Sequence, residues 1–232
     1  MPRSLDFAMT QGQVGFFAQD WRALGVVVGM ASEARIARRL GAPVAIGGGS
    51  AAGARLVAER LVAHGASALL SFGLAGGLAP GLHAGAVLVP GEVVTEGGRF
   101  TVDPALAGCL GGFTSHVVYG ADEVVASVEA KRTLHERTGC DAVDLESGAV
   151  AGVARARRVP FAVLRAVCDP AGRALPSAAV VALTVDGTVD VRRVIGSIMG
   201  EPGQIGGLLA LARDAAVARR ALMRTISRRP KN

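Results

Sequence analysis

The stretch VDLESGAVAGVARARRVPFAVLRAVCDPA, residues 143–171, carries the pattern on which the fold prediction rests. Residues 146–158 predict a helix, and the largely apolar run FAVLRAV, residues 161–167, predicts a buried strand. A helix followed directly by a buried strand is typical of a parallel sheet covered by helices. Asp169 follows this strand, at the end where open sheets of this kind usually bind ligands.

The same alternation of strands and helices extends along most of the chain. Further strands are predicted at residues 24–29, 44–46, 68–72, 86–90 and 116–119. Further helices are predicted at residues 33–40, 51–64, 125–138 and 208–227. We therefore predict an α/β fold, a single-domain three-layer αβα structure with a central mixed sheet.

The predicted domain spans residues 23–207. Residues 1–22 precede the first strand without a firm pattern and are expected to form an N-terminal arm. Residues 208–232 are expected to form a basic C-terminal helix, separated from the domain by the Pro- and Gly-containing stretch 200–207.

The composition favours an intracellular protein of one large domain, and it does not predict a metal site. Half of the 232 residues are hydrophobic but only 4% are aromatic, so the core is expected to consist of small, closely packed side chains. The three cysteines, Cys109, Cys140 and Cys168, are scattered, which predicts neither a disulfide framework nor a zinc site and favours a reducing cytoplasm. The four histidines are not clustered either. Because no secretory signal or membrane-spanning stretch is evident, we expect a cytoplasmic protein.

The basic charge is concentrated in the C-terminal segment. Residues 200–232 contain seven Arg or Lys against two acids, whereas the whole chain has a net charge of +6. With few aromatics for base stacking, this distribution weighs against nucleic-acid binding. An apolar stripe at helical spacing runs along the same segment: Leu208, Leu211, Ala215, Ala218, Leu222 and Ile226. The helix either packs on the domain or a second subunit, or lies peripherally on an anionic membrane.

Three carboxylates follow predicted strands or begin predicted helices. They are Glu33, Glu146 and Asp169. Each alone is explained by a favourable helix dipole or by a turn before proline. If the three strand ends meet in one crevice, they place a base, a sugar-binding carboxylate and an acid around one ligand.

Two glycine runs could bring the backbone close to a ligand. GLAGGL, residues 73–78, follows a strand, and GGGS, residues 47–50, precedes a helix. Their N–H groups could bind oxygen atoms, although such runs also form ordinary tight turns. Neither run has the spacing of a dinucleotide-binding or Walker loop.

Three ordered motifs resemble one enzyme superfamily. GMASEAR (29–35), SFGLAGGLAPGLHAGAVLVP (71–90) and the 143–171 stretch are similar to the purine nucleoside phosphorylase and methylthioadenosine/S-adenosylhomocysteine nucleosidase superfamily. Within it, GMASEARIARRL, GGGS and DPAGRALP most resemble the hopanoid-associated phosphorylases, which are thought to remove adenine from adenosylhopane. The resemblance implies cleavage of the N-glycosidic bond of an adenine nucleoside, an oligomeric enzyme and no cofactor.

The resemblance also implies a role for each carboxylate. Glu33 matches the acid that activates the attacking water, and Glu146 matches the glutamate that binds the ribose 2′ and 3′ hydroxyls. Asp169 matches the aspartate that protonates or hydrogen-bonds purine N7, which requires a pKa raised by desolvation.

Further substrate-site positions follow from the same alignment of motifs. Leu145 stands where a methionine packs beneath the ribose, and Arg165 matches an arginine near the acid. The remaining implied positions are Gly73, Ala75, Gly76, Val124 and Cys168.

The sequence leaves the nucleophile and the substrate open. The glycine loop lacks the arginine and hydroxyl typical of phosphate sites, which favours water, although Arg35, Arg55 or Ser50 could bind phosphate as a co-substrate in another way. A nucleosidase acting on methylthioadenosine or S-adenosylhomocysteine is an alternative to adenosylhopane cleavage. A non-catalytic nucleotide-binding or lipid-associated module is an alternative of another class, and it leaves the three carboxylates without a purpose.

Overall fold

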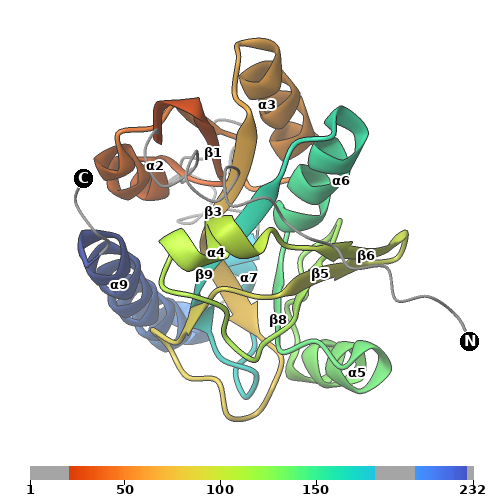
Figure 1. The fold of residues 1–232 in the computed structure, drawn as a ribbon. Helices are drawn as coiled ribbons and strands as arrows, with labels where there is room; N and C mark the ends of the chain where they lie inside the picture. The colour runs from red at the N-terminus through yellow and green to blue at the C-terminus, as the bar shows by residue number, and fades with distance from the viewer. Residues whose placement is uncertain (1–20, 181–201, 229–232) are drawn as a thin grey trace, which may run out of the picture.

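A nine-stranded mixed sheet forms the centre of the computed structural model, which describes residues 21–180 and 202–228 (Figure 1). Seven strands lie in the order β2-β1-β3-β8-β7-β5-β6, and β9 pairs with β3 and β4. The strands are β1 (Leu24–Val28), β2 (Val44–Ile46), β3 (Ala68–Gly77), β4 (Val87–Leu88), β5 (Glu92–Thr95), β6 (Gly98–Thr101), β7 (Val118–Gly120), β8 (Ala142–Asp144) and β9 (Phe161–Asp169).

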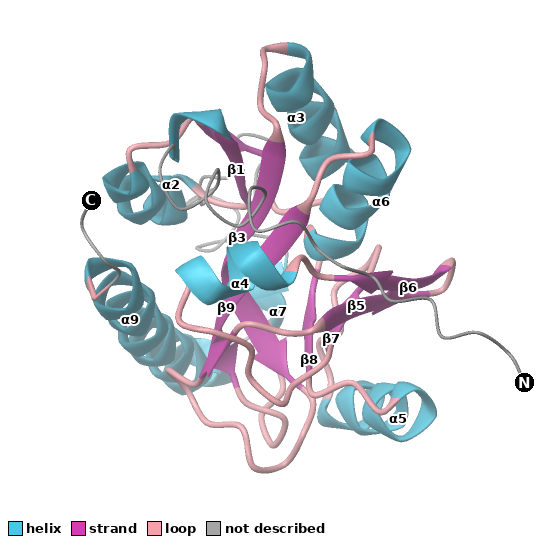
Figure 2. Cartoon of the chain, in the orientation of Figure 1, coloured by secondary structure: helices cyan, strands magenta, loops and turns pink. Residues whose placement is uncertain are grey.

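Helices cover the sheet on both sides (Figures 1 and 2). They are α2 (Ala31–Ala37), α3 (Ala51–Ala63), α4 (Pro104–Cys109), α5 (Val128–Thr138), α6 (Ser147–Arg157), α7 (Ser177–Val180) and α9 (Ile205–Ser227). The helices α3 and α6 pack against each other on one side, and α2 and α9 lie together on the other. The predicted single-domain α/β fold with a mixed central sheet is confirmed.

The core lies around three parallel neighbours, β1, β3 and β9. β3 pairs in parallel with β1 and with β9. Val26, Leu70 and Leu164 of these strands are buried. Aliphatic side chains on both faces suit strands covered by helices on both sides, which explains the continuous apolar runs in the sequence.

The glycine run 73–77 is part of a strand, not a loop, which corrects the sequence-based prediction. β3 continues to Gly77 because residues 73–76 keep pairing with β9, whose ladder compensates for the low strand propensity of glycine. The register shifts between Ala75 and Gly76: Ala75 opposes Val167 and Gly76 opposes Asp169. Cys168 is therefore an extra residue in β9, as in a β-bulge.

Several short elements were not predicted from the sequence. β5, β6 and β8 have three or four residues each, too few to show a clear periodicity. The helix α4 was also missed, although Asp103 caps it and Pro104 begins it, both of which are start signals. The helix α5 begins at Val128, three residues later than predicted, after the N-cap Ser127.

The C-terminal helix α9 packs on the domain. Ala218, Leu222 and Ile226 of its apolar stripe are buried, and the helix contacts β9. This arrangement fits the first of the two alternatives for the basic segment. No helix in the described part of the chain is long and apolar enough to cross a membrane. Most of the predicted arm, residues 1–20, lies outside the described residues, as do 181–201 and 229–232.

Candidate active site

The three predicted carboxylates meet at one cavity. It has a volume of about 180 Å³ and is lined by residues from the start of α2 and from the ends of β3, β8 and β9. Glu33, Glu146 and Asp169 all line it, and all three are buried. The expected crevice is therefore present at the ends of these strands.

Glu33 is held by backbone N–H groups from two segments. One carboxylate oxygen accepts from Gly29 (3.0 Å) and Met30 (2.8 Å), and the other accepts from Leu74 of β3 (2.8 Å). The contact from Met30 is also that of a helix capping box, since Met30 is the N-cap of α2. The third ties the start of the helix to β3. Glu33 thus has a fixed position relative to the cavity.

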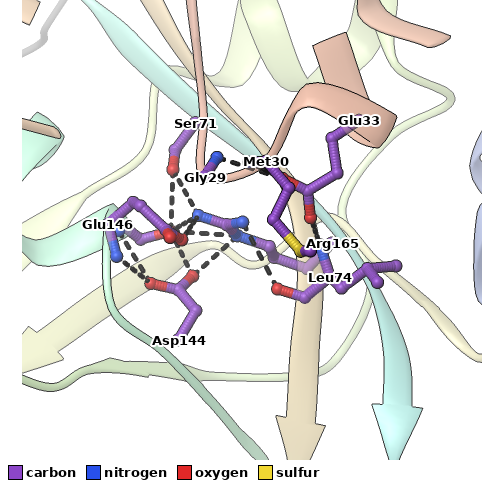
Figure 3. A network of polar contacts seen from close by, with 9 residues as sticks. Gly29, Met30, Glu33, Ser71, Leu74, Asp144, Glu146 and Arg165 are labelled. Carbon is purple, nitrogen blue, oxygen red and sulfur yellow. Dashed lines mark hydrogen bonds and ion pairs between the residues drawn. The ribbon is translucent and has the colours of Figure 1, made fainter. Parts of the chain in front are cut away.

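Arg165 lies at the centre of a buried network of polar contacts (Figure 3). Its guanidinium forms ion pairs with Asp144 (2.7 Å) and Glu146 (2.9 Å), and it donates to Ser71 (2.7 Å). Asp144 in turn accepts from the backbone N–H of Glu146 (3.0 Å). Arg165 is completely buried, so its charge is compensated by carboxylates and not by water.

Burial sets the pKa values of the two glutamates. Desolvation raises the pKa of Glu33, and Arg165 and the three backbone N–H groups oppose this increase. Desolvation also raises the pKa of Glu146 to about 7, against the lowering effect of Arg165 and with a contribution from Asp144. A carboxylate with a raised pKa is a stronger base than one in water, which suits Glu33 for proton abstraction.

Asp169 is paired with a buried lysine. Its Oδ2 accepts from Lys131 Nζ of α5 (2.5 Å), whereas its Oδ1 has no hydrogen-bond partner among the described residues. Desolvation raises the pKa of Asp169, and Lys131 opposes this increase. The direction agrees with the requirement for a protonated acid that the resemblance implied.

The other implied positions divide into two groups. Leu145, Ala75, Gly76, Val124 and Cys168 line the cavity. Gly73 and Arg165 do not line it; they are paired in the β3–β9 ladder, and Arg165 forms an ion pair with the lining residue Glu146. Burial raises the pKa of the Cys168 thiol to about 12, so this side chain contributes its surface and not a thiolate.

Gly73 leaves space for two functional side chains. A Cβ atom at this position would lie 2.5 Å from Arg165 Nη1 and 2.7 Å from Glu33 Oε1. Both side chains are buried and fixed by other contacts. A residue without a side chain is therefore required here by packing.

Two site residues were not found from the sequence. Asp144, in the motif VDLES, was passed over in favour of Glu146, although it bonds both Arg165 and the start of α6. Lys131 gives no signal by itself because lysines on helices are usually exposed. Its spacing of three residues from Leu134, the other buried residue of α5, places both on one helix face.

The candidate phosphate ligands do not meet at the cavity. Arg35 is exposed on α2, and Arg55 lines a neighbouring hollow whose other lining residues come mainly from the β5–β6 hairpin, α5 and α6. The Ser50 hydroxyl caps α3 by accepting from Gly53, and Ser50 does not line the cavity. Among the described residues, no group of three or more His, Cys, Asp or Glu is arranged to bind a metal ion.

Solved structures with a similar fold include a futalosine hydrolase and two nucleosidases. Futalosine hydrolase of Helicobacter pylori is 17% identical, with a TM-score of 0.63 over 88% of this chain and 97% of that chain. The 5′-methylthioadenosine/S-adenosylhomocysteine nucleosidase of Neisseria meningitidis, in complex with methylthio-immucillin-A, is 17% identical, with a TM-score of 0.61 over 87% of this chain and 98% of that chain. S-adenosylhomocysteine nucleosidase of Streptococcus pyogenes is 16% identical, with a TM-score of 0.61 over 90% of this chain and 97% of that chain.

The sequence also matches a family description directly. Residues 112–195 match the Phosphorylase superfamily. A search of curated proteins returned no match. The matched segment contains β8, Glu146, Arg165 and Asp169, and so includes much of the cavity wall. A segment of this chain thus matches the Phosphorylase superfamily, and the described fold is similar to that of the solved structures above.

Proposed function

We propose that this protein hydrolyses the N-glycosidic bond of a purine nucleoside, with water and not phosphate as the nucleophile. The observation that carries the proposal is the set of ionisable side chains that line the cavity. Five carboxylates, Glu33, Glu123, Asp144, Glu146 and Asp169, line it, and no Lys or Arg does so among the described residues.

Phosphate would find no free cation among the described residues of this cavity. Arg165 is paired with Asp144 and Glu146, and Lys131 is paired with Asp169. A phosphate dianion would therefore lose its hydration and face carboxylates without a compensating charge-assisted hydrogen bond. A neutral water molecule avoids this cost and can be activated by Glu33.

The three acids can act on successive parts of the substrate. The water oxygen attacks the sugar C1′ while Glu33 takes a proton from this water. Glu146 accepts hydrogen bonds from the ribose hydroxyls. The C1′–N9 bond breaks, its electron pair moves into the purine, and Asp169 gives a proton to N7. Each group then acts where charge develops in the transition state.

For the substrate itself, we propose an adenine nucleoside with an apolar 5′ group. Val124, Val125 and Leu175 line the cavity, and Val124 is exposed, so an aliphatic surface continues towards solvent. Adenosylhopane fits this description and the resemblance to the hopanoid-associated phosphorylases. The N. meningitidis relative binds a methylthio ligand, so methylthioadenosine is the alternative within the same class.

The test is adenine release by the purified full-length protein from adenosine, methylthioadenosine and adenosylhopane, each with and without phosphate. We expect adenine and free ribose sugar at rates that do not depend on phosphate. Formation of a sugar 1-phosphate would overturn the choice of water. Absence of adenine from every substrate would favour the non-catalytic module.

A further inference from the structure

Lys131 is an unusual residue for its helix. The helix α5 presents most of its charged side chains to solvent, and only Lys131 and Leu134 are buried in it. The Lys131 side chain is completely inaccessible. Burying an ammonium group is costly unless its charge and all its donors are satisfied, so this placement requires an explanation.

All three N–H donors of Lys131 have acceptors. Besides Asp169 Oδ2 at 2.5 Å, Nζ donates to the backbone oxygens of Arg173 (2.8 Å) and Pro170 (3.3 Å). This set of acceptors suits a protonated amine, which has three donors and no acceptor. Lys131 therefore places a positive charge directly behind the Asp169 carboxyl group.

Asp169 has one oxygen held and one oxygen free. Oδ2 is fixed by Lys131, while Oδ1 is buried and has no partner in the part of the chain that the structure describes, and the residue lines the cavity. An orphan carboxyl oxygen in a buried site calls for a polar partner. Because Asp169 lines the cavity, a ligand that enters the cavity can supply this partner.

We propose that Lys131 is a positioning residue that aims the Asp169 carboxyl at the purine and stabilises the carboxylate formed when the proton leaves. The inference rests on the proposed function, because it assigns Lys131 a role in the same proton transfer. Asp169 Oδ1–H gives its proton to N7 as the C1′–N9 electron pair enters the base. The negative charge that remains on Asp169 is paired at once with the Lys131 ammonium.

The charges around Asp169 support the role of Lys131 as the cation that stabilises the Asp169 carboxylate. Desolvation raises the pKa of Asp169, whereas Lys131 of α5 and Arg173 after β9 lower it, and Asp214 of α9 raises it. Arg173 and Asp214 form an ion pair with each other, so their effects at Asp169 partly cancel. The neighbouring Cys168 thiol stays neutral because burial raises its pKa to about 12. Lys131 is thus the main cation acting on the acid.

A purely structural role is the alternative. Lys131 also connects α5 to the turn after β9 through two carbonyl groups. Loss of these bonds would lower thermal stability and could displace Asp169. It would not systematically raise the pKa of Asp169. The direction of the change in this pKa therefore separates the two roles.

The experiment compares Lys131→Met, Lys131→Arg and the control Arg132→Met, which alters an exposed neighbour on the same helix. The measurement is the pH profile of kcat for adenine release. Activity that needs protonated Asp169 is lost as the pH rises through the pKa of Asp169. Because an opposite charge lowers such a pKa by about 1 to 3 units, Lys131→Met should move this limb upward by about that amount.

The maximal kcat should fall at the same time. Without Lys131, Asp169 is a weaker acid and its charged form is unpaired, so we expect a loss of about 10-fold or more in kcat with a smaller change in KM. Lys131→Arg, which keeps the charge, should restore the position of the limb. In an Asp169→Asn background, Lys131→Met should cause no further loss of kcat.

Two outcomes would overturn the inference. The first is a folded, active Lys131→Met enzyme whose alkaline limb coincides with that of the wild type. The second is an equal loss of kcat from Lys131→Met with and without Asp169. If Lys131→Met does not fold, Lys131→Gln replaces it, since its amide can still donate to the turn carbonyls.

A readout without substrate separates this inference from the proposed function. Infrared difference spectra against Asp169→Asn follow the protonated carboxyl of Asp169 during a pH titration. The carboxyl signal should persist to higher pH in Lys131→Met than in the wild type. Absence of adenine release with this shift present would contradict the proposed function alone, whereas unchanged titration would contradict the role of Lys131.

Discussion

At the scale of single residues, Glu33 combines a structural role, as an acceptor of backbone hydrogen bonds, with its proposed role as the base. The hydrogen bonds from the N–H groups of Gly29, Met30 and Leu74 hold both oxygens, so a glutamine could keep part of this network. What glutamine cannot do is accept the proton of a water molecule. The substitution therefore separates the base from its scaffold.

We expect Glu33→Gln to lower kcat by about 10²- to 10⁴-fold, with a much smaller change in KM. Steady-state adenine release measures both constants. Glu129→Gln, which removes an exposed acid from the first turn of α5, is the control and should retain wild-type kinetics. Near-normal kcat in Glu33→Gln would transfer the role of base to another group.

Residue patterns revealed the acids but not the cations that compensate them. Glu33, Glu146 and Asp169 stand next to predicted strand or helix ends, where sequence reasoning expects ligand contacts. Arg165 was found only through the resemblance, and Lys131 was not found at all. Its partner Asp169 is 38 residues away, and such a pairing depends on how α5 packs, which local patterns do not encode.

At the scale of elements, β3 and β9 form the support of the site. Gly73 opposes Arg165 in the ladder, and Leu74 next to it binds Glu33. The strand prediction for 68–72 stopped before this region because glycines normally weaken strands. At position 73, the close approach of two buried side chains requires a glycine, which is a tertiary reason that the sequence pattern does not show.

We expect Gly73→Ala to lower both activity and thermal stability. The added Cβ would lie within 2.7 Å of Glu33 and Arg165, so one of them must move and break contacts of the network. Thermal unfolding and adenine release are the measurements. The control is Gly152→Ala in α6, where a Cβ meets nothing within 4 Å.

Because alanine has a higher helix propensity than glycine, Gly152→Ala should keep activity and leave thermal stability unchanged or slightly higher. Equal behaviour of the two variants would show that the space at Gly73 is not needed.

Two leucines of the helix α9 allow a test of whether the basic segment is part of the core. Leu222 is completely buried, whereas Leu209 near the start of the same helix is 68% exposed. We expect Leu222→Ala to destabilise the protein by about 2 to 5 kcal/mol and Leu209→Ala to have little effect on unfolding. Denaturant unfolding measures the difference.

Liposome sedimentation of the same two variants addresses the membrane alternative for α9. Loss of liposome binding in Leu209→Ala, with unchanged folding, would favour contact of the exposed start of α9 with lipid. Loss of stability in Leu209→Ala equal to that in Leu222→Ala would contradict the observed packing.

At the scale of the whole molecule, the buried acids couple folding to pH. The pKa of Glu146 is raised from 4.5 to about 7 by desolvation, so the folded protein binds a proton that the unfolded chain has already released in this range. A raised carboxyl pKa makes the folded state more stable at low pH, and this stability is lost as the pH rises from 4.5 through about 7.

We therefore expect the melting temperature to fall as the pH rises from 5 to 7. The titration of Glu146 accounts for a loss of up to about 3 kcal/mol in the free energy of unfolding over this range. Calorimetry at a series of pH values measures this slope. Glu146→Gln should flatten the slope because the amide does not titrate. A melting temperature that rises with pH over this range, and an unchanged slope in Glu146→Gln, would each contradict the pKa assignment.

The bulge in β9 has a consequence for how the site can change. Side chains alternate along a strand, so the extra residue Cys168 sets the face on which Asp169 emerges. The direction of the acid thus depends on the number of residues in the strand more than on their identity. Side-chain replacement at position 168 can reshape the pocket wall gradually, but loss or gain of one residue there reverses the alternation. Evolutionary drift in this segment is therefore expected to proceed by substitution, with its length preserved.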